Sequence, residues 1–409
     1  MNKPLFLYVE ELRNDFVDCL IKRKDISLVL IRFKNSMNFS SEHIKETKHI
    51  PCFIIDKSQN IIDETERLRV FLSKFNQKVS CFYNDSEYNQ EYIQRIARSL
   101  NLNGALTERQ ATIVRDKAAM KDFISEIGLV HVDYCIIDSF DKAKSCSELW
   151  GYPFIIKWRR GVSSIEVYKI ENIKQLVALN LDYSTQKYIG EKYCKNKIWC
   201  IDAIVSNNRI LNNMFTWLPF TNLEFATTKT KFAQIAVGKP NVNWKISPKE
   251  ITQRIVSGLG MQNGYLHLEA FVDEDGFPTI CEFAWRTTGD HILSNYSELY
   301  KVSIPDILIN VLLGLDGIIL PEIEGYVSDV FLPIANGKIR KITSLKELSN
   351  SVDYIQGEIF LSEGDEVVSK NKYTDCSGWI QLSSKTISEM MDKIECVYAS
   401  FVLETETCE

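Results

Sequence analysis

The sequence has no apolar run long enough to span a bilayer, which argues against a membrane protein. Only five or six apolar residues precede Glu10 and Glu11, too few for the core of a signal peptide. The eleven cysteines form no C-x-x-C pair and show no spacing with histidine that suits zinc. Several lie in apolar runs, where a free thiol behaves as a small hydrophobic group. We therefore expect a reduced, cytoplasmic protein.

The sequence also has no excess of positive charge. The net charge is −6, and no basic run is present, so the sequence offers no footprint for nucleic acid. Internal repeats and low-complexity segments are absent too, while 45% hydrophobic and 25% charged residues are ordinary values for a globular protein. A chain of 409 residues is too long for one core, so two to four structural units are expected.

The first hundred residues alternate short apolar runs with helix-period segments. The runs LFLYV, SLVLIRF, PCFII and VSCF are typical of buried strands, and segments 62–75 and 88–100 have the period of helices. This alternation predicts a small parallel sheet with helices on its faces. The motif G-x-G-x-x-G is missing, so no nucleotide is assigned to this part of the chain.

Several elements of the remaining chain have clear start and stop signals. Asp116 can cap a helix over 116–127, and Gly128 can end it. Ser247, Pro248 and Glu250 predict a capping box at the start of a helix over 247–260. Other expected elements are strands at 151–157, 165–170 and 198–205, a helix from Ser303 to Gly314 and a long closing helix at 387–401. From about residue 325, short strands followed by this helix predict a separate C-terminal α+β subdomain.

The segment YLHLEAFVDEDGFPTICEF predicts a β-hairpin that carries two acids. Asp275-Gly276 lies between two apolar runs, and a type I′ turn requires positive φ at both central residues. A two-residue loop places Glu274 opposite Phe277, and the same register places Glu269 opposite Glu282. A four-residue loop would shift the register but keep both acids on one face.

The alternation of the first strand supports this arrangement. One face, expected in the core, holds the apolar side chains of Leu266, Leu268, Ala270 and Val272. The other face holds the larger and polar side chains of Tyr265, His267, Glu269 and Phe271. Two opposed carboxylates need a proton or a cation, and their oxygen atoms suit Mg²⁺. The competing interpretation is that both acids lie on the solvated rim of the hairpin.

Two lysines stand at the ends of predicted elements. Lys157 ends an apolar strand, and the turn RRGVSS behind it can offer backbone N–H groups to phosphate oxygens through Ser163 and Ser164. This turn has one glycine, and a lysine at a strand end often only extends its ammonium group to water. Lys117 follows Asp116 at a helix start and indicates no function by itself.

The order of these segments resembles the ATP-grasp superfamily over roughly residues 100–320, and its closest pattern is that of the L-amino acid (dipeptide) ligases, which are carboxylate–amine ligases. RDKAAMKDFISEIGL is similar to the D-K-x-x-M-K opening segment, and GYPFIIK is similar to the G-Y-P-hydrophobic-K strand. EKYCKNKIWCIDAIV resembles the hinge strand, and EAFVDEDGFPTICEFAWR resembles the metal hairpin. The C-terminal motifs GYVSDVFLP, EGDEV and GWIQLSS resemble the extra subdomain of the amino acid ligases.

The resemblance implies a role for each matching residue. Lys117 and Lys157 would bind the phosphates of ATP, with Lys157 and Arg286 as the catalytic pair. Glu191 would meet the adenine amino group, and the backbone of Lys192, Tyr193 and Cys194 would follow the adenine edge. Glu269 and Glu282 would hold Mg²⁺ (or Mn²⁺). Arg286 would lie over the transferred phosphate or the substrate carboxylate, and the segment after it supplies candidate substrate contacts at Gly289, Asp290 and His291.

Two positions depart from the pattern of the superfamily. Ala284 stands where an asparagine usually provides a further metal ligand, although some L-amino acid ligases share this alanine. Ile198 stands where an acid usually holds the ribose, which leaves Asp202 as the candidate replacement. The aromatic and polar stretch 214–232 is either a lid over the site or an edge of a lobe.

The implied fold is α/β and α+β: an ATP-grasp fold with a Rossmann-like N-terminal (pre-ATP-grasp) domain and a small C-terminal α+β subdomain. The expected limits are 1–112 for the N-terminal domain, 113–188 for the small lobe, 189–325 for the lobe with the metal hairpin and 326–409 for the C-terminal subdomain. The implied activity is ADP-forming ligation of a small-molecule carboxylate, an amino acid in the first instance, to an amine through an acyl phosphate. The alternatives are acylation of a carrier-protein thiol and a degenerate protein that only binds nucleotide. Nucleic acid and membrane are not expected partners, and a homodimer is the expectation from base rates.

Overall fold

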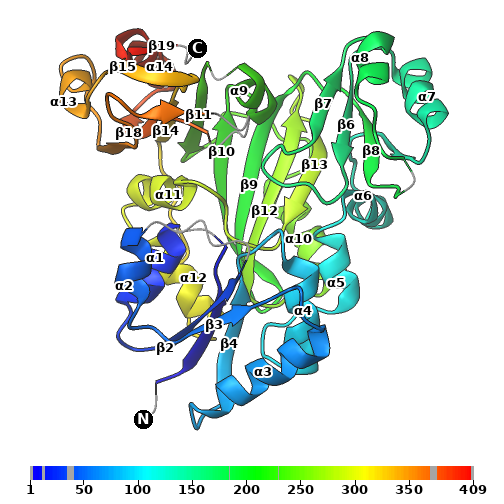
Figure 1. The fold of residues 1–409 in the computed structure, drawn as a ribbon, viewed down its shortest axis with the longest axis vertical. Coiled ribbons are helices and arrows are strands. Elements are labelled where there is room, and N and C mark those ends of the chain that lie inside the picture. The colour runs from blue at the N-terminus through cyan, green and yellow to red at the C-terminus, as the bar shows by residue number, and fades with distance from the viewer. Residues whose placement is uncertain are drawn as a thin grey trace.

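The computed structural model describes residues 3–11, 14–34, 41–183, 185–228, 230–368 and 375–406. Three of its sheets meet around the centre of the molecule, and the N-terminus and C-terminus lie at opposite ends of its long axis (Figure 1). Within the described ranges, no helix is both long enough and apolar enough to cross a membrane. The cytoplasmic location remains a prediction.

The N-terminal sheet is parallel, as the sequence predicts. Its strand order is β3-β2-β1-β4, formed by β1 (Leu5–Val9), β2 (Ser27–Phe33), β3 (Cys52–Ile55) and β4 (Val79–Asn84). Helix α1 (Asp15–Lys22) packs on one face, and α3 (Ile61–Ser73) and α4 (Gln90–Ser99) pack on the other. Helices α2 (Ser41–Thr47) and α5 (Glu108–Ile113) complete this part. The loop after β4 leaves the carboxyl end of the sheet, the edge at which α/β proteins bind ligands.

A smaller antiparallel sheet follows, drawn in cyan and green in Figure 1. Its order is β5-β8-β6-β7, formed by β5 (Tyr134–Ile137), β6 (Phe154–Trp158), β7 (Val167–Ile170) and β8 (Tyr188–Lys192). Helices α7 (Phe140–Trp150) and α8 (Ile173–Ala178) cover it with a small apolar core. Helix α6 (Lys117–Glu126) contacts β5 of this sheet and β13 (Pro278–Ala284) of the large sheet, and so connects the two sheets.

The large antiparallel sheet has the order β13-β12-β9-β10-β11-β14-β18-β16. Its strands are β9 (Lys197–Ser206), β10 (Arg209–Leu218), β11 (Phe232–Val237), β12 (Gly264–Val272), β13 (Pro278–Ala284), β14 (Tyr326–Leu332), β16 (Gln356–Ile359) and β18 (Gly378–Ser384). Helices α10 (Pro248–Leu259) and α14 (Ile387–Ser400) pack on one face, and α11 (Ile292–Tyr300) and α12 (Ile304–Leu312) pack on the other. Helix α9 (Asn222–Thr228) lies between β10 and β11 in the chain.

The C-terminal part adds strands to this large sheet and also builds a sheet of its own. Strand β14 pairs with β11 along its whole length, so the large sheet is continuous across the predicted limit at residue 326. A three-stranded sheet stands apart in the order β17-β15-β19, formed by β15 (Gly337–Ile342), β17 (Glu366–Val367) and β19 (Leu403–Glu406), with α13 (Leu345–Leu348) nearby. The domain limits stay predictions.

The helix boundaries confirm most of the predicted caps. The Asp116 carboxylate accepts hydrogen bonds from the N–H groups of Ala118 and Ala119 at the start of α6. The Ser247 hydroxyl accepts one from Glu250 N–H, but the predicted reciprocal bond of a capping box is wrong. The Glu250 side chain lies instead 2.5 Å from Arg254, one turn further along α10, where an opposite charge is available.

Candidate active site

The hairpin of β12 and β13 places Glu269 directly opposite Glu282, as the sequence predicts. The predicted two-residue turn is wrong, however, because Val272 pairs with Pro278 and leaves five residues in the loop. Within this loop only Gly276 has a positive φ, +83°, and Gly276 N–H donates to the Asp273 carbonyl. An irregularity in the pairing between Glu269 and Ala270 then shifts the register by one residue and restores the predicted pair.

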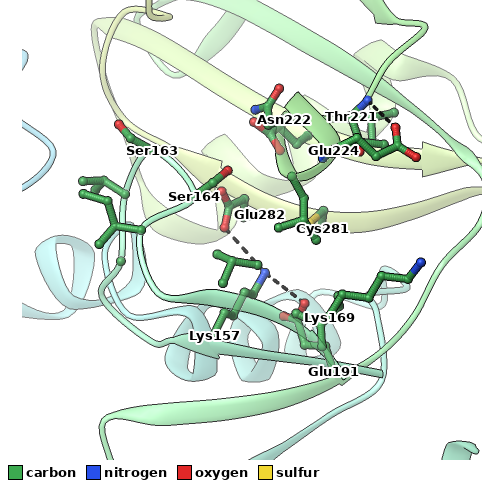
Figure 2. Close-up of a pocket in the computed structure, with 18 of the residues that line it drawn as sticks. Lys157, Ser163, Ser164, Lys169, Glu191, Thr221, Asn222, Glu224, Cys281 and Glu282 are labelled. Atoms are coloured by element: carbon green, nitrogen blue, oxygen red, sulfur yellow. Dashed lines mark hydrogen bonds and ion pairs between the residues drawn. The ribbon is translucent and has the colours of Figure 1, made fainter. Parts of the chain in front are cut away.

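Two lysines contact Glu282, and a third lies beside the neighbouring Cys281. Lys117 Nζ lies 3.1 Å from a Glu282 oxygen and donates to the Gly161 carbonyl at 2.9 Å. Lys157 Nζ lies 2.9 Å from a Glu191 oxygen and 3.8 Å from Glu282 (Figure 2). Lys121, one turn after Lys117 on α6, is fully buried and bridges Glu191 at 3.0 Å and the Cys281 carbonyl at 3.0 Å.

The lysines and acids of this group pair with one another, and these contacts shift the pKa of Glu282 and of Lys157. Three ammonium groups, those of Lys117, Lys121 and Lys157, face two carboxylates, those of Glu191 and Glu282. Burial raises the pKa of Glu282, but the ammonium groups of Lys117 and Lys157 outweigh it and lower the pKa to about 2. Burial likewise opposes the charge of Lys157, yet the Glu191 carboxylate raises the pKa of this lysine above its ordinary value. Lys157 therefore keeps its positive charge near pH 7.

One cavity of about 840 Å³ lies between the small sheet and the large sheet and is lined by Lys117, Lys157, Glu191 and Glu282 (Figure 2). The predicted phosphate turn reaches it through Ser163 and Ser164, whose φ values of +53° and +56° are unusual for residues with a side chain. Backbone strain of this kind gathers at ligand sites. The predicted hinge residues Lys192, Tyr193 and Cys194 line the same cavity. The Glu191 side chain also lines the cavity and lies 3.0 Å from Lys121 and 2.9 Å from Lys157.

The N-terminal domain supplies an acid to the cavity that the sequence did not indicate. Glu87, in the loop after β4, accepts hydrogen bonds from Arg286 at 2.7 Å and contacts Arg115 at 4.0 Å. Burial raises the pKa of Glu87, but Arg286 and Lys117 lower it below the ordinary value. The neighbouring Asp85 accepts hydrogen bonds from the N–H and hydroxyl of Thr287. The loop after β13 is thereby fixed to the N-terminal sheet.

The predicted substrate contacts separate in the structure. Gly289 and Asp290 line the cavity, and the Asp290 carboxylate accepts a hydrogen bond from Gln234 at 3.1 Å. His291 is absent from the residues that line it, because its ring stacks on Trp379 with centroids 3.6 Å apart. Burial lowers the pKa of His291 to about 4, so this imidazole is neutral near pH 7.

The position predicted to hold a ribose has an apolar neighbourhood. Ile198 lines the cavity beside Leu218 and Phe271. The candidate replacement Asp202 is fully buried and lies outside the cavity lining. It accepts hydrogen bonds from Tyr296 at 2.7 Å and lies 2.6 Å from His267 Nδ1, so it cannot reach a ribose.

The stretch 214–232 contributes to the cavity wall. Its described residues, 214–228 and 230–232, include the end of β10, helix α9 and the start of β11, and residues 221–224 and Thr228 line the cavity. This placement favours a covering element over a plain lobe edge.

Two signals could have identified the residues that sequence reasoning missed. Lys121 stands four residues after Lys117 on a predicted helix, so both ammonium groups share one face. Asp85 and Glu87 directly follow a predicted strand of a parallel sheet, at the edge where sites form. The contact between Glu87 and Arg286, 199 positions away, had no local signal.

No protein-family model matches the chain. It is 22% identical over 272 residues to the L-arginine-specific L-amino acid ligase of Bacillus subtilis, an alignment that covers 64% of each protein. The chain thus spans less than two thirds of the length of that relative. Among solved structures it is similar to an L-amino acid ligase from Bacillus licheniformis, with a TM-score of 0.77, 15% identity and 99% of both chains covered.

A second solved structure extends the likeness. The biotin carboxylase domain of 2-oxoglutarate carboxylase from Hydrogenobacter thermophilus, in complex with MgADP, ADP and bicarbonate, has a TM-score of 0.66 at 14% identity. The similarity covers 98% of this chain and 90% of the biotin carboxylase domain. The chain therefore has the ATP-grasp fold predicted from its sequence.

Proposed function

We propose that this protein is an ATP-dependent carboxylate–amine ligase that activates an amino acid as an acyl phosphate and couples it to an amine, releasing ADP and phosphate. The observation that carries the proposal is the convergence of Lys117, Lys157, Glu269, Glu282 and Arg286 on one cavity of about 840 Å³. That volume lies within the usual range of about 300–1,000 Å³ for ligand sites. The amino acid ligases named above support the substrate class.

The nucleotide would lie between the two sheets. Its phosphates would replace Glu282 as the partner of Lys117 and Lys157 and would meet the turn at Ser163 and Ser164. The base would contact the backbone of residues 192–194 and the apolar wall of Ile198, Leu218 and Phe271. This arrangement gives each charged part of ATP a group of opposite charge.

The two opposed acids fit a divalent cation. Glu269 and Glu282 offer oxygen ligands from neighbouring strands, and their side chains remain 18% and 31% exposed at the cavity. Mg²⁺ prefers one or two carboxylates together with phosphate oxygens. When bound there, Mg²⁺ would neutralise negative charge on the phosphates. Mn²⁺ takes the same oxygen ligands.

The reaction needs positioning and charge stabilisation more than covalent help from the protein. A substrate carboxylate oxygen attacks the γ-phosphorus, the bond between that phosphorus and the bridging oxygen breaks, and ADP leaves. The amine then attacks the acyl carbon, phosphate leaves, and the nitrogen loses a proton to solvent. Arg286 would stabilise the negative oxygens, and its hydrogen bond to Glu87 would orient its guanidinium. His291 is not assigned the proton, since it stacks on Trp379 outside the cavity lining.

The alternatives have less support. None of the relatives named above is described as acting on a carrier protein, so the carrier-thiol acceptor has no observation in its favour. The departures at Ala284 and Ile198 motivate the degenerate protein, but both acids, both lysines and Arg286 are present at the cavity. A homodimer stays a prediction, and the biotin carboxylase relative is described as a dimer.

Release of ADP and phosphate across a panel of amino acid pairs tests the proposal, with mass spectrometry of the product. We expect Glu282→Gln to lower turnover by roughly 10²- to 10³-fold, as for the loss of one electrostatic contact in a transition state. Lys157→Met should abolish ADP formation. The matched control is Lys174→Met, which removes an exposed lysine of α8 in the same lobe and should leave turnover unchanged.

Two outcomes would contradict the proposal in different ways. Retained turnover in Glu282→Gln and Lys157→Met would mean that the site is misplaced. ATP binding without ADP release for every carboxylate tested would favour the protein that only binds nucleotide.

A further inference from the structure

Beside the two opposed acids lies a second group of side chains with different ligand chemistry. Strands β9 and β12 are antiparallel neighbours, and Glu269 pairs with Cys200 in their register. Two residues along, the same register sets His267 beside Asp202. Because side chains alternate along a strand, the four side chains form a compact square on one face of the sheet.

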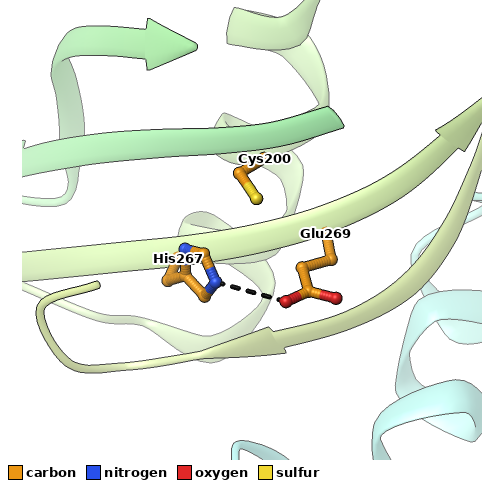
Figure 3. Close-up of side chains that lie close together, drawn as sticks. All are labelled: Cys200, His267 and Glu269. Atoms are coloured by element: carbon orange, nitrogen blue, oxygen red, sulfur yellow. Dashed lines mark ion pairs between the residues drawn. The ribbon is translucent and has the colours of Figure 1, made fainter. Parts of the chain in front are cut away.

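Three of these side chains present one metal-binding atom each to a common point. The thiol of Cys200, a ring nitrogen of His267 and a carboxylate oxygen of Glu269 all lie within 4.8 Å of one another (Figure 3). His267 Nε2 is 3.5 Å from Glu269 Oε1. Bonds of 2.0–2.2 Å to nitrogen and oxygen in a tetrahedral zinc site put such ligands about 3.4 Å apart. The imidazole–carboxylate edge is thus already at the right length, and the thiol, within 4.8 Å of both partners, needs a shift of at most about 1.3 Å.

The fourth side chain of the square orients the histidine. Asp202 is fully buried and lies 2.6 Å from His267 Nδ1. It is itself fixed by a hydrogen bond of 2.7 Å from Tyr296, whose hydroxyl also meets Thr216 at 2.9 Å. A carboxylate on one ring nitrogen leaves the other ring nitrogen as the ligand, which is the usual support of a metal-bound histidine. The square therefore contains three ligand atoms and a fixed supporting acid.

We propose that Cys200, His267 and Glu269 form a binding site for a borderline-soft divalent cation, Zn²⁺ in the first instance, distinct from the all-oxygen pair of Glu269 and Glu282. Thiolate and imidazole suit Zn²⁺, whereas Mg²⁺ takes oxygen ligands. The three residues line the main cavity, so a cation reaches them from solvent and keeps an open fourth position toward that cavity. Binding displaces the proton of the Cys200 thiol and the proton on His267 Nε2, and both go to solvent.

Glu269 is common to both metal sites, and this has a kinetic consequence that rests on the proposed function. Zn²⁺ held by Cys200 and His267 takes Glu269 away from Glu282. Zn²⁺ should therefore inhibit ADP formation at a fixed Mg²⁺ concentration, and a chelator should restore it. On the neighbouring strand β13, Ala284 pairs with His267, so a small side chain lies next to the zinc ligands.

Cobalt provides a direct test, because a thiolate bound to Co²⁺ produces an intense charge-transfer absorption. The full-length protein is freed of metal and titrated with Co²⁺ without nucleotide. We expect one equivalent to produce the charge-transfer band, a small excess of Zn²⁺ to remove it and a large excess of Mg²⁺ to leave it. Cys200→Ser should abolish the band. His267→Gln should weaken Co²⁺ binding at least tenfold, which gives a second measurement should Cys200→Ser not fold.

The matched control addresses the other close thiols. Cys135 and Cys146 lie with their sulfur atoms 2.9 Å apart in the small lobe and could also bind Co²⁺. The Cys135→Ser variant should keep the full band if the site is at Cys200. A band that is missing from the unaltered protein, that survives in Cys200→Ser, or that disappears in Cys135→Ser would overturn the proposal. Metal binding measured this way is independent of ligase activity. A protein that gives the band but forms no ADP contradicts the proposed function alone.

Discussion

Thr287 and Thr288 are adjacent and almost fully buried, at 1% and 2% exposure, yet their hydroxyl groups have different surroundings. The Thr287 hydroxyl donates to the Asp85 carboxylate at 2.6 Å, whereas Thr288 Oγ1 has no partner within the described part of the chain. Valine has the same shape and lacks the hydroxyl. We therefore expect Thr287→Val to lower the free energy of unfolding by about 1.5–3 kcal/mol, the usual value for a hydrogen bond to a charged group.

Thr288→Val is the matched control for this prediction. It removes a buried hydroxyl without a partner and should leave stability unchanged or raise it. Urea denaturation of both variants measures the two free energies. Equal losses in Thr287→Val and Thr288→Val would mean that Asp85 does not fix the loop after β13.

The stacked ring of His291 predicts a dependence of stability on pH. Burial lowers the folded pKa of His291 from 6.5 to about 4. As the pH falls, the imidazole therefore takes up a proton in the unfolded state before it does so in the folded state. The free energy of unfolding thus decreases between pH 6.5 and pH 4. His291→Phe keeps a ring on Trp379 and removes the titration. From pH 7 to pH 4 the unaltered protein should lose up to about 3 kcal/mol relative to this variant.

Chemical denaturation of both proteins at pH 7 and pH 4 gives this difference directly. Comparing the variant with the unaltered protein cancels the other groups that titrate in the same range. The same loss of stability in both proteins would show that the imidazole is not held neutral by burial.

Among the elements, the hairpin that carries both acids depends on the conformation of one glycine. Gly276 has φ +83°, and a Cβ atom there would collide with the Asn243 carbonyl oxygen. Gly314, at the end of α12, has a similar φ of +75°, but nothing lies within 4 Å of its Cβ position. Alanine at Gly314 should cost only the backbone strain of about 1–2 kcal/mol. Alanine at Gly276 should cost at least about 2 kcal/mol more, because the clash adds to the same strain.

Thermal denaturation of the two alanine variants measures this difference. Gly276→Ala should also weaken ATP-dependent activity, since the turn sets the approach of β12 to β13. Identical melting temperatures for the two variants would show that the loop at Asn243 moves aside without cost.

The same hairpin shows how much of the site could be predicted from sequence. Period-two alternation and a glycine turn located both strands and the correct pair of acids. They missed the longer loop and the irregularity near Cys281, where distant segments make contact: Lys245 N–H donates to the Gly276 carbonyl, and Lys121 donates to the Cys281 carbonyl. Strand and helix positions follow from local patterns. The contacts of Glu87 with Arg286 and of Asp202 with His267 join distant segments and follow only from the fold.

At the scale of the whole molecule, one set of lysines forms ion pairs with acids of two different sheets. Helix α6 carries Lys117 and Lys121 against β13, and β6 carries Lys157 against β8. Glu282 and Glu191 form ion pairs with these lysines and so connect the small sheet to the large one. The triphosphate of ATP competes with Glu282 and Glu191 for the same ammonium groups. Once ATP is bound, these carboxylates need another cation as their partner.

This competition predicts that ATP and Mg²⁺ bind cooperatively and that Glu282 carries the coupling. In the unaltered protein, ATP without Mg²⁺ meets the negative charge of Glu269 and Glu282, and Mg²⁺ relieves it. Glu282→Gln removes one of these charges, so ATP alone should bind more tightly and ATP with Mg²⁺ less tightly. The ratio of the two dissociation constants should fall at least tenfold, a loss of about 1.4 kcal/mol in coupling. Calorimetry with and without a chelator measures both constants.

Glu171→Gln is the control for this cooperativity, because Glu171 also lines the cavity but pairs with Lys169 at 3.1 Å. It should change both dissociation constants in parallel and leave their ratio unchanged. Because the proposed Mg²⁺ site includes Glu282 and not Glu171, the two variants distinguish a specific site from a general effect of negative charge. An unchanged ratio in Glu282→Gln, or an equal fall in Glu171→Gln, would place the cation elsewhere in the cavity.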